Sequence, residues 1–268
     1  MRETSFLNIS VRNNVKVIGE GTTTLLFGHG FGCDQHTWRS VSPAFEKDYR
    51  VVLFDYVGAG KSDLSAYDSE RYSSLEGYAK DIVEICEELE LQNVIFIGHS
   101  VSSMIGLLAL KQNPSIFKKI VFIGPSPRYI NEPGYDGGID RDDLDELLDV
   151  MDSNYMGWSQ MVAPSIMGNP DRPELGQDLA ASFCAMDPGI ARQFARVTFM
   201  SDNRHDLLYL NVPSLTIQCN DDFLTSQYIA EYIHQHTTGN EVVLLPSSGH
   251  CPHLSDPKAV IKAIKSFI

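Results

Sequence analysis

Residues 94–102 read VIFIGHSVS, an apolar run that ends in a serine flanked by small residues. The apolar part, residues 94–97, predicts a buried strand, and the residues after Ser100 are compatible with a helix. Gly98 and Ser102 stand two places before and two places after Ser100, where a sharp strand-to-helix turn leaves little room for a side chain. The pattern G-x-S-x-S, in place of the commoner G-x-S-x-G, therefore predicts that Ser100 is a nucleophile on such a turn.

An acid and a histidine follow Ser100 in the order that this chemistry needs. Residues 213–219 predict a buried strand that leads to Asp221 and Asp222, and residues 241–245 predict a strand that leads to His250. The carboxyl ends of parallel strands meet at one edge of a sheet, so these side chains are expected near Ser100. A serine hydroxyl needs a base to take its proton, and an imidazole needs an acceptor that fixes its tautomer. Either aspartate could serve, and His250, not His253, has the Gly-His-x-Pro context.

A glycine-containing loop upstream is the expected oxyanion hole. Residues 24–28 predict a strand that runs into the sequence HGFG at residues 29–32. The glycines allow close approach of the backbone to a substrate, and the N–H of Phe31 can join the N–H of Val101 in holding an oxyanion. Loss of one such donor typically costs about 3 kcal/mol of transition-state stabilisation.

These motifs, taken together, resemble those of the α/β-hydrolases, and specifically of the RsbQ-type hydrolases, which resemble the plant karrikin and strigolactone receptors. The matching segments run nearly from end to end of the chain and are residues 29–35, 54–58, 98–101, 124–127, 187–188 and 249–253. The resemblance implies that Ser100 is the nucleophile, Asp222 the acid and His250 the base, with Phe31 and Val101 as oxyanion donors. Ser102 stands where the family's strand-to-helix turn more commonly has its second glycine, and residues 224–226 lack the proline that often follows the acid.

The order of strand and helix signals predicts an α/β fold with a mostly parallel sheet and helices on both faces. Apolar residues at helical spacing predict one amphipathic helix over residues 75–89. From residue 128 to residue 206 the strand signals stop, and the segment is rich in acidic and helix-forming residues. We therefore expect a core domain of residues 1–127 and 207–268, with a helical cap inserted at residues 128–206.

The expected reaction is acyl transfer from a small, apolar ester or lactone, including butenolide-like rings, to Ser100. Trp158 and Phe194 match pocket positions of the family, and the resemblance implies that both line the substrate pocket. Packing between the cap and the core is the alternative for these residues. A second interpretation is a ligand sensor with slow or single turnover that signals to a protein partner. A third is cofactor-free haloperoxidase or carbon–carbon hydrolase activity, which uses the same three side chains.

Composition excludes several other classes. A net charge of −14 and a pI near 4.9 argue against nucleic-acid binding, and no segment predicts a membrane span. Five cysteines without paired spacing predict reduced thiols and a cytoplasmic location.

The sequence GKS at residues 60–62 resembles part of a P-loop but lacks the P-loop glycine, because Asp55 occupies that position. We expect no cofactor, and no metal, since no second ligand cluster accompanies residues 250–253.

Overall fold

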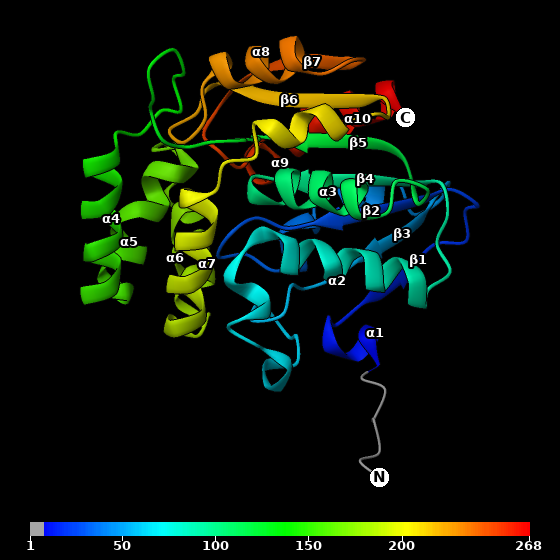
Figure 1. Cartoon of the computed structure of the whole chain (residues 1–268), viewed down its shortest axis with the longest axis horizontal. Helices are drawn as coiled ribbons and strands as arrows, with labels where there is room; N and C mark the ends of the chain where they lie inside the picture. The colour runs from blue at the N-terminus through cyan, green and yellow to red at the C-terminus, as the bar shows by residue number, and fades with distance from the viewer. Residues whose placement is uncertain (1–7) are drawn as a thin grey trace.

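The computed structural model describes residues 8–268 and contains a seven-stranded sheet in the order β1-β3-β2-β4-β5-β6-β7 (Figure 1). β1 pairs with β3 in an antiparallel manner, and every other neighbouring pair is parallel. The predicted mostly parallel sheet is therefore confirmed. The strands are β1 Lys16–Ile18, β2 Thr24–Gly28, β3 Arg50–Leu53, β4 Val94–His99, β5 Phe117–Ile123, β6 Ser214–Asp221 and β7 Asn240–Ser248.

Helices cover both faces of this sheet. One face is covered by α2 (Leu75–Glu88), α3 (Val101–Gln112) and α8 (Gln227–His236), and the other by α10 (Pro257–Phe267) and the segments after β2. The helix predicted from residue 75 is α2, and its buried residues keep the predicted helical spacing. The remaining short elements are α1 Ile9–Arg12, α9 Pro252–Ser255, and the 3₁₀ turns Gln35–Trp38, Ser42–Ala44, Leu64–Ala66, Arg71–Ser73 and His205–Tyr209.

Four helices lie in the chain between β5 and β6 and stand beside the sheet, at the left of Figure 1. Their large apolar side chains, among them Leu144, Trp158 and Phe183, belong to the same buried cluster as the sheet face that α2, α3 and α8 cover. The exact limits of the predicted cap, residues 128–206, stay a prediction. The helices are α4 Arg141–Ser153, α5 Tyr155–Met167, α6 Pro173–Cys184 and α7 Pro188–Met200. Within residues 8–268, none of the helices has the length and apolar character needed to cross a bilayer.

β4 passes into α3 through a single strained residue. Ser100 has φ of 55° and ψ of −123°, a conformation that side-chain-bearing residues rarely adopt. The sharp bend at Ser100 brings the start of α3 back against the end of β4. A Cβ on residue 98 would therefore lie 2.6 Å from the carbonyl oxygen of Ser102. Glycine is required at residue 98 because this approach is made by backbone, which cannot move aside without opening the turn.

Gly98→Ala is therefore expected to lower the free energy of unfolding by about 1–3 kcal/mol, the usual cost of overpacking a core. Urea unfolding measures the change. Gly189→Ala is the control, since the new Cβ would meet only a side-chain oxygen of Asp187, at 3.2 Å, and its effect should stay below about 1 kcal/mol. Equal stability of Gly98→Ala and the wild type would contradict this account of the turn.

Candidate active site

Three side chains from three different strand ends meet at the carboxyl edge of the sheet. Ser100 follows β4, Asp222 follows β6, and His250 follows β7. The Nε2 atom of His250 lies 2.7 Å from Ser100 Oγ, and its Nδ1 atom lies 2.9 Å from Asp222 Oδ2 and 3.1 Å from Oδ1. The structure thus brings together the three residues that the sequence singled out as nucleophile, acid and base.

The hydrogen-bond partners decide which way the protons point. An ionised carboxylate only accepts hydrogen bonds, so His250 Nδ1 carries a proton and donates a hydrogen bond to Asp222. In the neutral imidazole Nε2 is then the acceptor, and the Ser100 hydroxyl donates a hydrogen bond to it. This is the arrangement in which a histidine can take the proton of an attacking serine.

The surroundings of Asp222 keep it ionised although it is buried. Burial by itself raises the pKa of this carboxyl, but the neighbouring His250 and several hydrogen bonds outweigh burial and lower the pKa. The Leu224 and Thr225 N–H groups donate to Oδ1 at 2.9 and 3.2 Å, and the Thr225 hydroxyl and Gln218 amide donate to Oδ2. Neither residue 224 nor residue 225 is proline, so both N–H groups are available to the acid.

The two alternatives that the sequence left open lie elsewhere. The side chain of Asp221, the last residue of β6, is exposed, and no hydrogen bond joins its carboxylate to a histidine in the described chain. His253 is buried, its Nε2 lies 2.7 Å from the Thr37 hydroxyl, and its ring packs against Trp38. Burial lowers the pKa of His253 well below its usual value, so its ring stays neutral. Within residues 8–268 no group of His, Cys, Asp and Glu side chains could hold a metal ion.

The candidate oxyanion donors, Phe31 and Val101, lie in the backbone segments that follow β2 and β4. Val101 is the first residue of α3, where a backbone N–H has no acceptor within the helix. Phe31 follows β2 by three residues, and its ring lines the cavity at Ser100. The assignment of their N–H groups as an oxyanion hole stays a prediction, but both backbone segments lie at the strand ends where it requires them.

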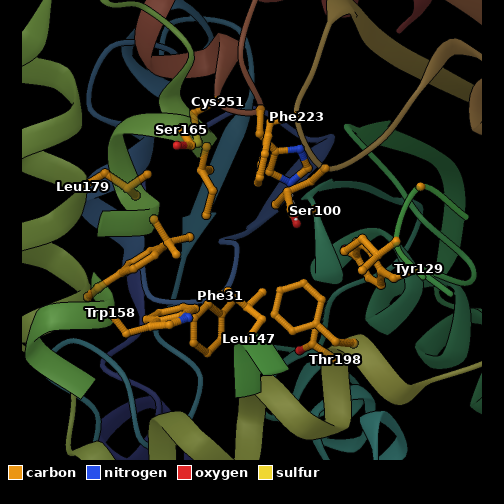
Figure 2. A pocket seen from close by; sticks show the side chains of 18 of the residues that line it. Phe31, Ser100, Tyr129, Leu147, Trp158, Ser165, Leu179, Thr198, Phe223 and Cys251 are labelled. Atoms are coloured by element: carbon orange, nitrogen blue, oxygen red, sulfur yellow. Dashed lines mark hydrogen bonds between the residues drawn. The ribbon is translucent and has the colours of Figure 1, made fainter. Parts of the chain in front are cut away.

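A cavity of about 460 Å³ opens onto Ser100 between the strand ends and the four helices. Figure 2 shows Ser100 on one side of the cavity and Trp158 and Leu179 across from it. Among the described residues that line the cavity, Asp143, which is exposed, is the one with a carboxylate. Most of the lining residues are apolar or aromatic, and these include Phe31, Cys33, Ile139, Leu147, Trp158, Met161, Val162, Ile166, Leu179, Phe183, Phe199, Phe223, Leu224 and Cys251.

The structure differs from the sequence-based interpretation at Phe194. Trp158 lines the cavity as expected, but Phe194 is not among the lining residues. Its ring stacks on Tyr78 with centroids 4.4 Å apart and lies 5.7 Å from the ring of Phe31. Phe194 therefore packs behind Phe31, because α7 presents this residue to α2 and leaves Thr198 and Phe199 to face the cavity.

Two residues of the site were missed by the sequence analysis. Tyr129 lines the cavity beside Ser100, and burial raises the pKa of its phenol to about 12, so the hydroxyl remains a donor. Phe223 lies next to the acid, lines the cavity and is 63% exposed. The available signal was that both residues lie in the segments that follow β5 and β6, at the edge of the sheet that carries Ser100.

Comparisons with known proteins identify the family of this chain. The model of the "Alpha/beta hydrolase family" matches residues 25–263. Over 257 residues the chain is 40% identical to the Karrikin insensitive 2 receptor CA of Petunia hybrida, a match that covers 96% of this chain and 95% of that protein. Over 259 residues it is 36% identical to the Strigolactone esterase D14 of Arabidopsis thaliana, with 96% and 97% covered.

A solved structure is similar over the same extent. A hydrolase from Oleispira antarctica matches with a TM-score of 0.95 and 43% identity, and the match covers 97% of this chain and 96% of that one. The chain therefore belongs to the α/β-hydrolase family. The predicted resemblance to the plant karrikin and strigolactone receptors is confirmed.

The two adjacent aspartates provide a direct test of the site. Asp222→Asn is expected to lower kcat for ester hydrolysis by up to about 10⁴-fold, because an amide no longer fixes the tautomer of His250 or stabilises its cation. Asp221→Asn should change kcat by less than about threefold, since its side chain faces solvent. Steady-state kinetics on p-nitrophenyl acetate give both values. A large loss in Asp221→Asn and none in Asp222→Asn would reassign the acid.

Proposed function

We propose that this protein hydrolyses a small, apolar ester or lactone through a triad of Ser100, His250 and Asp222. The observation that carries the proposal is the hydrogen-bonded series from Asp222 through His250 Nδ1 and Nε2 to Ser100 Oγ, which ends at the wall of a cavity. Membership of the α/β-hydrolase family and the similarity to a protein named an esterase support the reaction class. Apolar residues at these three strand ends would pack at least as well as this buried polar series, so packing alone does not account for it.

In the proposed mechanism Ser100 Oγ attacks the carbonyl carbon while its proton passes to His250 Nε2. Asp222 stabilises the imidazolium, and the N–H groups of Phe31 and Val101 hold the negative charge on the carbonyl oxygen. His250 then gives the proton to the leaving oxygen, so that an alcohol departs, or stays attached when the substrate is a lactone. Water attacks the acyl group with His250 as base and releases the acid and Ser100.

The cavity supports the substrate class. Its volume of about 460 Å³ lies in the lower part of the range for ligand pockets, about 300–1,000 Å³. The walls carry apolar and aromatic side chains with few polar groups, such as Tyr129 and Thr198. A compact, neutral molecule with one ester group fits these surroundings, and butenolide-like lactones are the form that the similarity to karrikin and strigolactone proteins favours.

The proposal also covers the division of the chain into core and cap and the location of the protein in the cell. We assign residues 128–206 as a cap over the core of residues 1–127 and 207–268, because α4–α7 supply much of the cavity wall facing Ser100. A cytoplasmic location is supported by the five cysteines, all of which are free thiols. No cofactor takes part in the proposed steps.

A series of p-nitrophenyl esters from acetate to palmitate, with one butenolide probe, tests the substrate class. The value of kcat/KM should be highest for the shortest chains and for the butenolide and should fall steeply afterwards, since long chains exceed the cavity. Trp158→Ala should partly relieve the fall, because the buried indole forms the wall across from Ser100. A maximum at long chains would contradict the small-substrate proposal.

The second candidate is a ligand sensor that signals to a protein partner. It is favoured by the 40% identity to a protein named a receptor, and it uses the same cavity. The ester series separates the two: steady multiple turnover supports the hydrolase. A single turnover followed by a ligand-dependent change in melting temperature supports the sensor.

A further inference from the structure

Ser102, which stands where the G-x-S-x-G pattern has its second glycine, makes two buried hydrogen bonds. Its side chain is fully buried, and Oγ lies 2.5 Å from the carbonyl oxygen of His29 and 2.8 Å from the Tyr56 hydroxyl. A carbonyl oxygen only accepts, so the Ser102 hydroxyl donates to His29 and accepts from Tyr56. The bonds therefore run in one direction, from Tyr56 through Ser102 to the backbone of the loop after β2.

The same loop is fixed at a second point by the ring of His29. The Tyr56 backbone N–H donates to His29 Nε2 at 3.2 Å, so the ring proton is on Nδ1, which donates to the Gly30 carbonyl at 2.9 Å. Burial lowers the pKa of His29, which keeps the ring neutral and leaves Nε2 free to accept. Burial also raises the pKa of Tyr56, so its phenol keeps the proton that it donates to Ser102.

The position of Ser102 in the chain gives these contacts their importance. Ser102 comes one residue after Val101, and His29 comes two residues before Phe31. The Ser102 hydroxyl thus joins the two backbone segments that carry the proposed oxyanion donors. A Cβ on residue 28 would lie 3.0 Å from both Ser102 Oγ and the Tyr56 hydroxyl oxygen, so glycine at residue 28 leaves the space in which the hydroxyls meet.

We propose that Ser102 is a positioning residue that sets the separation of the Phe31 and Val101 N–H groups. This role rests on the proposed hydrolase function. Oxyanion donors act only when they lie about 2.7–3.1 Å from the place where the charge develops, and a misplacement of about 1 Å can cost on the order of 100-fold in rate. Because the oxyanion exists in the transition state and not in the bound ester, the loss should fall on kcat and spare KM.

Ser102→Ala tests the role, and Ser103→Ala is the matched control. Ser103 is also buried and lies in the same helical turn, but its hydroxyl donates to the Gly98 carbonyl at 3.1 Å and does not reach the loop. Ser102→Ala is expected to lower kcat on p-nitrophenyl acetate by about 10- to 100-fold. KM should change by less than about twofold. Ser103→Ala should change kcat by less than about threefold, whatever its effect on melting temperature.

The affinity for a trifluoromethyl ketone separates a positioning role from a merely structural one, because the adduct of the ketone with Ser100 places an oxyanion in the same site. The inhibition constant of the ketone should increase in Ser102→Ala by the factor by which kcat falls. The constant should stay unchanged in Ser103→Ala. Tyr56→Phe, which removes the donor to Ser102, should give a smaller loss in the same direction. Should Ser102→Ala fail to fold, Ser102→Gly takes its place, since glycine is the commoner residue in this turn.

Three results would overturn the proposal. The first is a folded Ser102→Ala or Ser102→Gly variant with wild-type kcat and ketone affinity. The second is an equal loss in Ser103→Ala, which would indicate a general effect of the helical turn. The third is a wild-type protein that neither hydrolyses the ester nor forms the ketone adduct, which would contradict the proposed hydrolase function itself and with it the role of Ser102.

Discussion

The backbone turn at Ser100 is the constraint on which the rest of the site depends. A residue with a side chain at φ of 55° and ψ of −123° is strained, at a typical cost of about 1–3 kcal/mol. The surroundings hold it there: the Ser100 N–H donates to the Ile123 carbonyl at 2.8 Å, and the Ser103 N–H donates to the Ser100 carbonyl at 2.9 Å. The turn aims Oγ out of the sheet and into the cavity, and it starts α3 with the N–H of Val101 beside it.

Burial around the turn shapes the electrostatics of the site. His99, next to the nucleophile, is buried, and burial with the nearby His250 lowers its pKa to about 3, so it stays neutral and its Nε2–H donates to the His250 carbonyl. His253 is neutral for the same reason. Among these three histidines, His250 is the one whose ring contacts both a hydroxyl and a carboxylate. In apolar surroundings these charge interactions are stronger than they would be in water.

The sequence predicted the parts of the site that depend on local geometry. The turn around Ser100 is recognisable because its steric demands fall on neighbouring residues. The acid and the histidine are recognisable because each comes within two residues of the end of a strand. Phe194 packs on Tyr78 and is absent from the cavity lining, and Tyr129 and Phe223 were missed, because the lining depends on how α4–α7 and the loops turn toward the core. Ser102 looked like a departure from the pattern; its partners, 46 and 73 residues away, become visible only in the fold.

The central claim is that Ser100 carries the acyl group during turnover. The most direct measurement is mass spectrometry of the protein quenched within milliseconds of mixing with p-nitrophenyl acetate, followed by peptide mapping. The account predicts a transient acetyl group on Ser100 that forms and decays at rates compatible with kcat and is absent in Ser100→Ala. An acetyl group on a different residue at those rates, or undiminished hydrolysis by Ser100→Ala, would contradict it.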